Sequence, residues 1–221
     1  MKIEWGGERF ELMADRAVHW PARSTLIVTD THFGKAASFR HASIPVPAGT
    51  TSRDLQRLTV LLTQTGAQRL LILGDFFHAR TGRAPGTLEV IAAWRRQHAS
   101  LAIDLVRGNH DERAGDPPEE WGIAVHAETL RDGPLVFCHH PCEREDGFVM
   151  AGHEHPAVRL ESPDGSRVRM PCFCFGVRQA LLPAFGSFTG ARRIRPRSGD
   201  RVFVPVDGEV VEVRTADVSV R

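Results

Sequence analysis

The sequence predicts an α/β protein in which two packed β-sheets carry helices on their outer faces. Short apolar, β-branched runs alternate with helix-period patterns in the first half of the chain. After residue 115 the pattern changes to short strands separated by turns, with little helix. Five of the apolar runs end in aspartate, asparagine or histidine. These observations together indicate an α/β fold with a site at the ends of its strands.

The first half of the chain is predicted to alternate strands and helices. Leucines at helical spacing follow the capping residues Thr50, Thr51 and Ser52, and Gly66 ends that helix. Thr87 opens a second helical pattern. A strand, helix, strand order is typical of parallel strands joined by crossover helices. The expected elements are a strand at 26–29, the helix between residues 52 and 66, a strand at 69–73, a helix at 87–98 and a strand at 101–107.

The second half of the chain is predicted to be rich in β-structure. Asp164-Gly165 and Asp207-Gly208 lie between apolar runs, as two-residue hairpin turns require. No internal repeat or low-complexity linker divides the chain, so we expect a single domain over 1–221. The expected strands are 123–126, 135–138, 148–151, 168–175, 202–206 and 209–213.

The composition excludes some classes of protein. The formal net charge is +1, so no global field favours a polyanionic partner. Four cysteines lack a C-x-x-C spacing, which favours buried free thiols over a zinc site. The N-terminal segment lacks the apolar core of a signal peptide, and no run approaches the roughly 18 to 20 apolar residues of a membrane span. We therefore expect a soluble, cytoplasmic protein.

The chemistry is concentrated at the ends of five apolar runs, TLIVTDTH, LLILGDFFH, IDLVRGNHD, LVFCHH and FVMAGHEH. If their strands are neighbours, these ends converge in one crevice. Carboxylate, amide and imidazole ligands suit Mn²⁺, Fe²⁺ or Zn²⁺, and seven of them are too many for one ion with open positions. The sequence therefore predicts a site for two divalent ions. Its ligands are Asp30, His32, Asp75, Asn109, His139, His153 and His155.

The same runs resemble the calcineurin-like metallophosphoesterase superfamily, whose blocks are D-x-H, G-D, G-N-H-D/E, V-x-x-H and G-H-x-H in that order. The resemblance implies a four-layer α/β/β/α sandwich of two mixed sheets flanked by helices. The matching blocks are Asp30-Thr31-His32, Gly74-Asp75, Gly108-Asn109-His110-Asp111, Val136-Phe137-Cys138-His139 and Gly152-His153-Glu154-His155.

Transferred residue by residue, the resemblance implies that Asp75 bridges the two metals. One metal would be held by Asp30, His32, Asp75 and His155, and the other by Asp75, Asn109, His139 and His153. A hydroxide bridging the metals would attack phosphorus. His110 would protonate the leaving oxygen or steady the transition state, and Asp111 would orient His110.

Two adjacent histidines compete for the fourth block. The V-x-x-H register selects His139 over His140, because neighbouring residues of a strand point to opposite faces. Many relatives are expected to have an acid where this chain has His140. The ligand set remains complete with either residue.

The runs around the blocks narrow the substrate class. GDFFHAR departs from the G-D-x-V-D-R-G of protein phosphatases, which excludes that class. Longer runs, including THFGKAASFRHASIPVPAGTT, RGNHDERAGDPPEEWGI and LPAFGSFTG, resemble the bacterial ligase-associated DNA-damage-response endonucleases. This resemblance implies manganese-dependent cleavage of DNA phosphodiesters, in a repair system with a helicase, a nuclease and a DNA ligase. The alternatives are a small-molecule phosphodiesterase or nucleotidase and, in another class, a non-catalytic scaffold.

Several basic residues are candidates for contacts with the substrate. Lys35, Arg80 and Arg107 lie in loops of the predicted site, where cations would contact phosphates flanking the scissile one. His78 has either a substrate-facing or a structural role. The arginines between residues 192 and 201 form either a solvated face or a binding surface.

Overall fold

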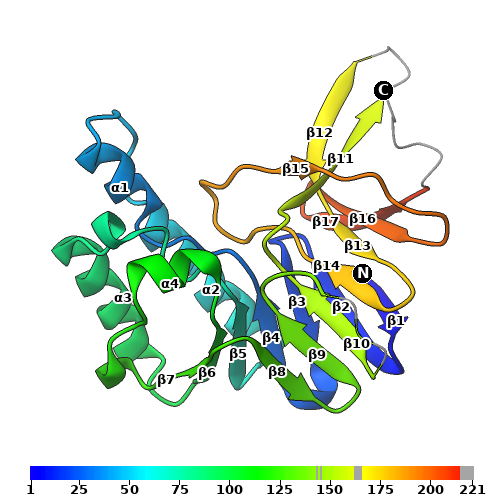
Figure 1. The fold of residues 1–221 in the computed structure, drawn as a ribbon, viewed down its shortest axis with the longest axis horizontal. Helices are drawn as coiled ribbons and strands as arrows, with labels where there is room; N and C mark the ends of the chain where they lie inside the picture. Colours follow the sequence, from blue (N-terminus) through cyan, green and yellow to red (C-terminus); the bar gives the residue numbers. More distant parts are fainter. Residues whose placement is uncertain (143, 145, 162–165, 215–221) are drawn as a thin grey trace.

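The computed structural model describes residues 1–142, 144, 146–161 and 166–214 (Figure 1). Two seven-stranded sheets pack face to face, and the longer helices lie against the outside of the first sheet. This architecture confirms the predicted α/β class with two mixed sheets. No helix among the described residues combines the length and apolar character that crossing a bilayer requires.

The first sheet has the strand order β1-β2-β3-β4-β5-β6-β7. Its first four strands form an antiparallel meander, and β4 to β7 run parallel. The parallel part brings the carboxyl ends of β4, β5 and β6 to one edge. The strands are β1 (Lys2–Trp5), β2 (Glu8–Met13), β3 (Ala17–Trp20), β4 (Thr25–Val28), β5 (Arg69–Leu73), β6 (Ala102–Val106) and β7 (Ile123–His126).

All helices among the described residues lie before Gly122. The apolar faces of α2 and α3 pack on the first sheet through residues such as Leu58 and Trp94. Gly66 ends α2 in a left-handed conformation, as the sequence predicted. The α-helices are α1 (Lys35–His41), α2 (Thr50–Thr65), α3 (Pro85–Gln97) and α4 (Asn109–Ala114), and the 3-10 helices are η1 (Pro21–Arg23), η2 (Arg80–Gly82) and η3 (Glu119–Trp121).

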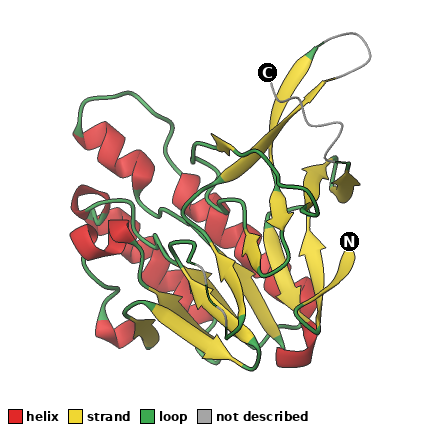
Figure 2. Ribbon diagram, turned by 45° about the vertical axis from the view of Figure 1, so that its right-hand side comes forward, coloured by secondary structure: helices red, strands yellow, loops and turns green. Residues whose placement is uncertain are grey.

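The second large sheet has the order β17-β16-β13-β14-β10-β9-β8, with β9, β10 and β14 parallel. A three-stranded sheet, β12-β11-β15, extends beyond it (Figures 1 and 2). The strands are β8 (Thr129–Asp132), β9 (Leu135–Cys138), β10 (Phe148–Ala151), β11 (Pro156–Glu161), β12 (Arg167–Pro171), β13 (Phe173–Phe175), β14 (Gln179–Leu181), β15 (Arg192–Arg193), β16 (Arg201–Val206) and β17 (Glu209–Val213).

The core between the two large sheets is aromatic and fully dehydrated. Trp20 of β3 approaches Phe137 of β9 with ring centroids 6.0 Å apart, and Phe203 of β16 meets Phe175 of β13 at 5.9 Å. Burial of such side chains supplies most of the free energy that holds the sheets together. The ends of β9 and β10 are therefore fixed against those of β4 and β5.

The second half of the chain differs from prediction in two respects. The expected outer helices of the second sheet are absent from its described residues, and the three-stranded sheet covers part of that face by packing Val158 and Met170 near Cys174. The single strand expected at 168–175 is divided, because the chain passes at Cys172 from the small sheet to the large one.

The predicted hairpin turns have different outcomes. Asp207 and Gly208 both have positive φ and join β16 to β17, as the sequence predicted. Asp164-Gly165 lies outside the described residues.

We expect Phe203→Ala to destabilise the protein strongly, because it opens a cavity between the sheets. The ring is fully buried, and the expected loss in the free energy of unfolding is about 3 to 5 kcal/mol. Urea denaturation measures it. The control is Val177→Ala, at a side chain that is 80% exposed, where the change should stay within about 0.5 kcal/mol. Equal effects in both variants would contradict this account of the core.

Candidate metal centre

The structure brings all seven predicted ligands to one edge of the two large sheets. Each lies just beyond the carboxyl end of a parallel strand, where an open α/β sheet forms its sites. Asp30 and His32 follow β4, Asp75 follows β5, Asn109 follows β6, His139 follows β9, and His153 and His155 follow β10.

Five of these residues have a left-handed backbone, which only glycine adopts at low cost. The φ angles are 52° for Asp30, 46° for His32, 54° for Asp75, 65° for His153 and 45° for His155. Such conformations cost about 1 to 3 kcal/mol each and persist only where surrounding structure enforces them. The left-handed turn changes the direction of the chain after each strand and places the side chain at the sheet edge.

The three glycines that precede ligands leave room for other ligands. A Cβ atom on Gly74 would overlap the His139 ring, and one on Gly108 would overlap the Asp75 carboxylate. A Cβ atom on Gly152 would overlap the Thr29 hydroxyl. The ligand loops therefore pack too closely for any larger residue at these positions.

One group of ligands surrounds Asp30, a fully buried carboxylate. Its Oδ1 atom lies 3.1 Å from His155 Nε2, which lies 3.4 Å from His32 Nε2. His32 Nε2 is in turn 3.6 Å from Asp75 Oδ2. Burial lowers the pKa of His32 to about 2, so this imidazole remains neutral and can coordinate a cation.

The second group surrounds His139 Nε2. This nitrogen lies 3.3 Å from Asp75 Oδ1, 3.1 Å from Asn109 Oδ1 and 3.2 Å from His153 Nδ1. His139 Nδ1 donates a hydrogen bond to the Leu73 carbonyl, which directs Nε2 toward these atoms. Atoms that can bind a metal thus converge around one point.

The residues present fit divalent metal ions. Asp30 Oδ1 and His32 Nδ1 are buried without a hydrogen-bond partner among the described residues. Burial and the charge of Asp30 raise the pKa of Asp75 to about 6, so a bound cation would stabilise the charged form of this carboxylate. A mixed set of carboxylate, amide and imidazole donors suits Mn²⁺, Fe²⁺ or Zn²⁺.

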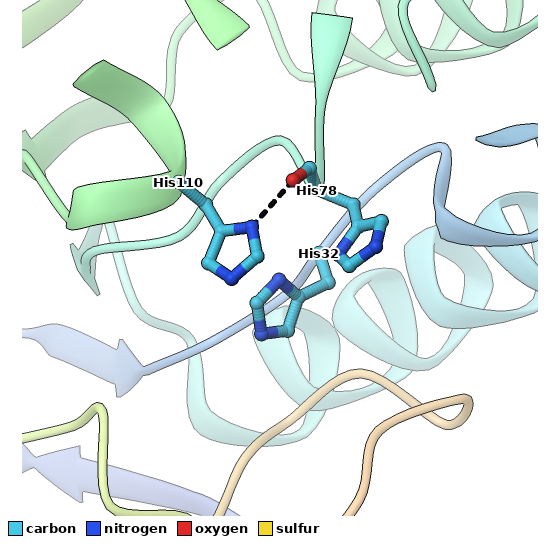
Figure 3. Close-up of side chains that lie close together, drawn as sticks. All are labelled: His32, His78 and His110. Carbon is cyan, nitrogen blue, oxygen red and sulfur yellow. Dashed lines mark hydrogen bonds between the residues drawn. The ribbon is translucent and has the colours of Figure 1, made fainter. Parts of the chain in front are cut away.

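His32, His78 and His110 form an imidazole group at the margin of the centre (Figure 3). His110 Nδ1 donates to the His78 carbonyl at 2.5 Å, which directs Nε2 toward Asp75 Oδ2 at 4.0 Å. The His78 ring stacks on His110 with centroids 4.9 Å apart. Burial, Lys35 and His110 lower the pKa of His78 to about 4, so His78 supports His110 as a neutral ring.

Asp111 has a different position from the one predicted. Its buried carboxylate accepts hydrogen bonds from the backbone N–H groups of Gly108 and Phe77, each at 3.0 Å, and none from the His110 ring. Burial outweighs these bonds and raises its pKa to about 6. The prediction that Asp111 orients the His110 side chain is therefore wrong. Asp111 instead ties the loop after β5 to the start of α4.

The choice between the two adjacent histidines follows from their burial. His139 is buried within the ligand group, whereas His140 is exposed. The His140 ring contacts His153, with ring centroids 4.0 Å apart. His139 therefore occupies the central position that the sequence register favours, and His140 flanks it.

The side chains predicted to contact the substrate differ in their surroundings. Lys35 begins α1, and burial lowers its pKa although Asp75 and Asp30 favour its charge. Arg80 is exposed on η2. Arg107 forms a two-pronged ion pair with Asp116 at 2.9 and 2.6 Å, so its guanidinium is already engaged.

One group of supporting residues was not predicted. Arg57 of α2 donates to Asp54, to Asp15 and to the Phe185 carbonyl. The segment 185–190 contacts the metal loops in turn, because Gly186 N–H donates to the Asp30 carbonyl. Asp54 is buried on the apolar face of α2, next to Leu55. An acidic residue among the apolar positions of this helix is the sequence signal that could have indicated this group.

The segment 185–190 also fixes a ligand directly. His155 Nδ1 donates to the Gly190 carbonyl at 3.2 Å, which turns its Nε2 atom toward Asp30. The contacts between α2 and this segment therefore position His155 indirectly.

A solved structure closely similar to this chain is that of the Pseudomonas putida nuclease MPE, with 41% sequence identity and a TM-score of 0.85 over 96% of this chain and 99% of that one. The YfcE phosphoesterase of E. coli matches at 16% identity and a TM-score of 0.43, covering 88% of this chain and 99% of that one. AQ665 of Aquifex aeolicus, a protein of unknown function, matches at 18% identity and a TM-score of 0.40, covering 59% of this chain and 78% of that one. No family model and no curated protein matches the chain.

Metal affinity should fall with decreasing pH. Without metal, the raised pKa of Asp75, about 6, means that a proton occupies the carboxylate below that pH and must leave when a cation binds. From about pH 7 to about pH 5 the Mn²⁺ affinity should therefore drop at least about tenfold. Calorimetry in buffers of different ionisation enthalpy counts the released protons. A pH-independent affinity without proton release would contradict this assignment.

Arg57→Ala should destabilise the fold, because it leaves the buried Asp54 carboxylate without its cation. The expected loss is about 2 to 4 kcal/mol in the free energy of unfolding, and Arg57→Lys should recover little of it. Chemical denaturation of metal-free protein provides the measurement. Arg53→Ala, at an exposed position on the same helix, is the matched control and should have little effect.

Proposed function

Because this chain belongs to the calcineurin-like metallophosphoesterase superfamily, we propose that it is an endonuclease that hydrolyses DNA phosphodiesters with two divalent metal ions. The observation that carries this proposal is the convergence of two ligand groups that share Asp75, with His110 beside them. The similarity of nearly the whole chain to a protein described as a nuclease supports the same activity.

The proposed reaction needs activated water and neutralised phosphate oxygens, which two bound divalent cations supply. Asp30, His32, Asp75 and His155 would hold one ion, and Asp75, Asn109, His139 and His153 the other. The ligand chemistry suits Mn²⁺, Fe²⁺ or Zn²⁺, and among these ions the family resemblance favours Mn²⁺.

The chain's own groups would hold and protonate the substrate. His110 is partly exposed, with Nδ1 fixed on a carbonyl and Nε2 directed at the centre. In its protonated form the ring can donate from Nε2 to the leaving oxygen. Lys35, partly buried near Asp75 and Asp30, can hold a phosphate oxygen.

We further propose a place in DNA repair, in association with a DNA ligase, a helicase and a second nuclease. The flanking runs that resemble the ligase-associated endonucleases support this assignment. The residues of the metal centre are common to many phosphoesterases. They therefore support the proposed activity but do not identify the pathway.

Purified protein should nick supercoiled plasmid when Mn²⁺ is added and should stop when EDTA removes it. Asp75→Asn should lower the nicking rate at least about 100-fold, because both ligand groups lose a shared anion. Agarose gels that separate supercoiled, nicked and linear forms measure the rate.

Asp207→Asn is the matched control for this substitution. It removes one carboxylate at an exposed hairpin turn with positive φ, where asparagine fits well. Its rate should equal that of the parent. If the plasmid stays intact and a cyclic nucleotide is cleaved instead, the result contradicts the proposed endonuclease and supports a small-molecule phosphodiesterase.

A further inference from the structure

A wide basic hollow lies next to the metal centre, on the side of the three-stranded sheet. Its volume is about 900 Å³, and its lining residues come from the segment 192–200, from the β13–β14 turn and from the loop after β9. The lining includes six arginines against two acids. The arginines are Arg144, Arg178, Arg192, Arg193, Arg195 and Arg197, and the acids are Glu154 and Asp200.

The two acids neutralise little of this positive charge. Glu154 pairs with Arg192. Asp200 accepts a hydrogen bond from the backbone N–H of Arg197 at 2.7 Å, so it constrains the loop and leaves the guanidinium of Arg197 available. Arg195 and Arg197 are exposed, and neither side chain forms an ion pair within the described part of the chain.

The hollow is joined to the metal centre through the backbone. Glu154 lies between the ligands His153 and His155, and its carboxylate reaches out to Arg192. The Arg192 N–H donates to the His155 carbonyl at 2.8 Å, where β15 begins to pair with β11. The basic segment is therefore held at a fixed position relative to the ligand loop.

From this arrangement we propose that the basic hollow is a subsite for the DNA strand, with Arg195 and Arg197 binding backbone phosphates beside the one at the metal centre. The inference rests on the proposed function and deepens it by naming where the polymer runs. A small diester has only the phosphate at the metal centre, whereas a polynucleotide presents a phosphate at every residue. The hollow thus favours a polymeric substrate over a small one.

The test uses Arg195→Ala/Arg197→Ala in the full-length protein. Affinity for a labelled DNA oligonucleotide, measured with EDTA present, should fall at least about fivefold at low salt, because two phosphate contacts are lost. The slope of log affinity against log salt should decrease by up to about 1.8 on duplex DNA. Plasmid nicking at subsaturating DNA should fall in parallel. Hydrolysis of bis(p-nitrophenyl) phosphate should remain at the parental rate.

The matched control is Arg9→Ala/Arg96→Ala, which removes two exposed arginines that do not line the hollow. It should behave as the parent in every assay. Thermal unfolding of both variants checks that the fold is retained.

Each remaining outcome has a definite meaning. If the parent cleaves DNA and the Arg195/Arg197 variant binds and cleaves it equally well, the subsite is refuted and the proposed function stands. If both substrates are hydrolysed more slowly by the variant, the arginines support the metal centre, and the subsite is likewise refuted. If the parent binds DNA through these arginines without cleaving it, the proposed function fails and the subsite stands. A parent that neither binds nor cleaves DNA refutes both.

Discussion

The convergence of metal-binding side chains in one buried space is the constraint on which the rest of the structure depends. His139 Nε2 faces the oxygens of Asp75 and Asn109, and Asp30 Oδ1 has no hydrogen-bond partner in the described residues. Such an arrangement is costly in a dehydrated crevice unless cations join the atoms. The surrounding fold holds these atoms together. Without bound metal, their proximity lowers the net stability of the fold.

The fold enforces this proximity through its backbone. Left-handed ligand residues turn the chain at the strand ends, and adjacent glycines let the loops approach one another. The aromatic core between the sheets supplies free energy that offsets the strain, since each buried ring contributes at least as much as one strained residue costs. Rigid sheets thus give the ligand loops little freedom to relax, which preorganises the centre for its ions.

Much of the site could be predicted because its residues interrupt strongly apolar runs. The bounds of β9, β10 and β17 agree with the predicted strands for the same reason. The strands β1 and β2 were not predicted, because polar residues alternate in them without a clear boundary, and the unpredicted β3 has only four residues. The contacts of Asp111 and Arg57 join segments distant in sequence, so spacing within any one run carries no information about them.

The order of the ligand loops along the chain determines when the centre can form. Asp30 follows the fourth strand, whereas its neighbour His155 follows the tenth, and both ligand groups need residues from each large sheet. During synthesis the first sheet emerges with Asp30, His32, Asp75 and Asn109, and neither ligand group is complete without His139, His153 and His155. Both ligand groups are therefore complete only after the second sheet has docked on the first.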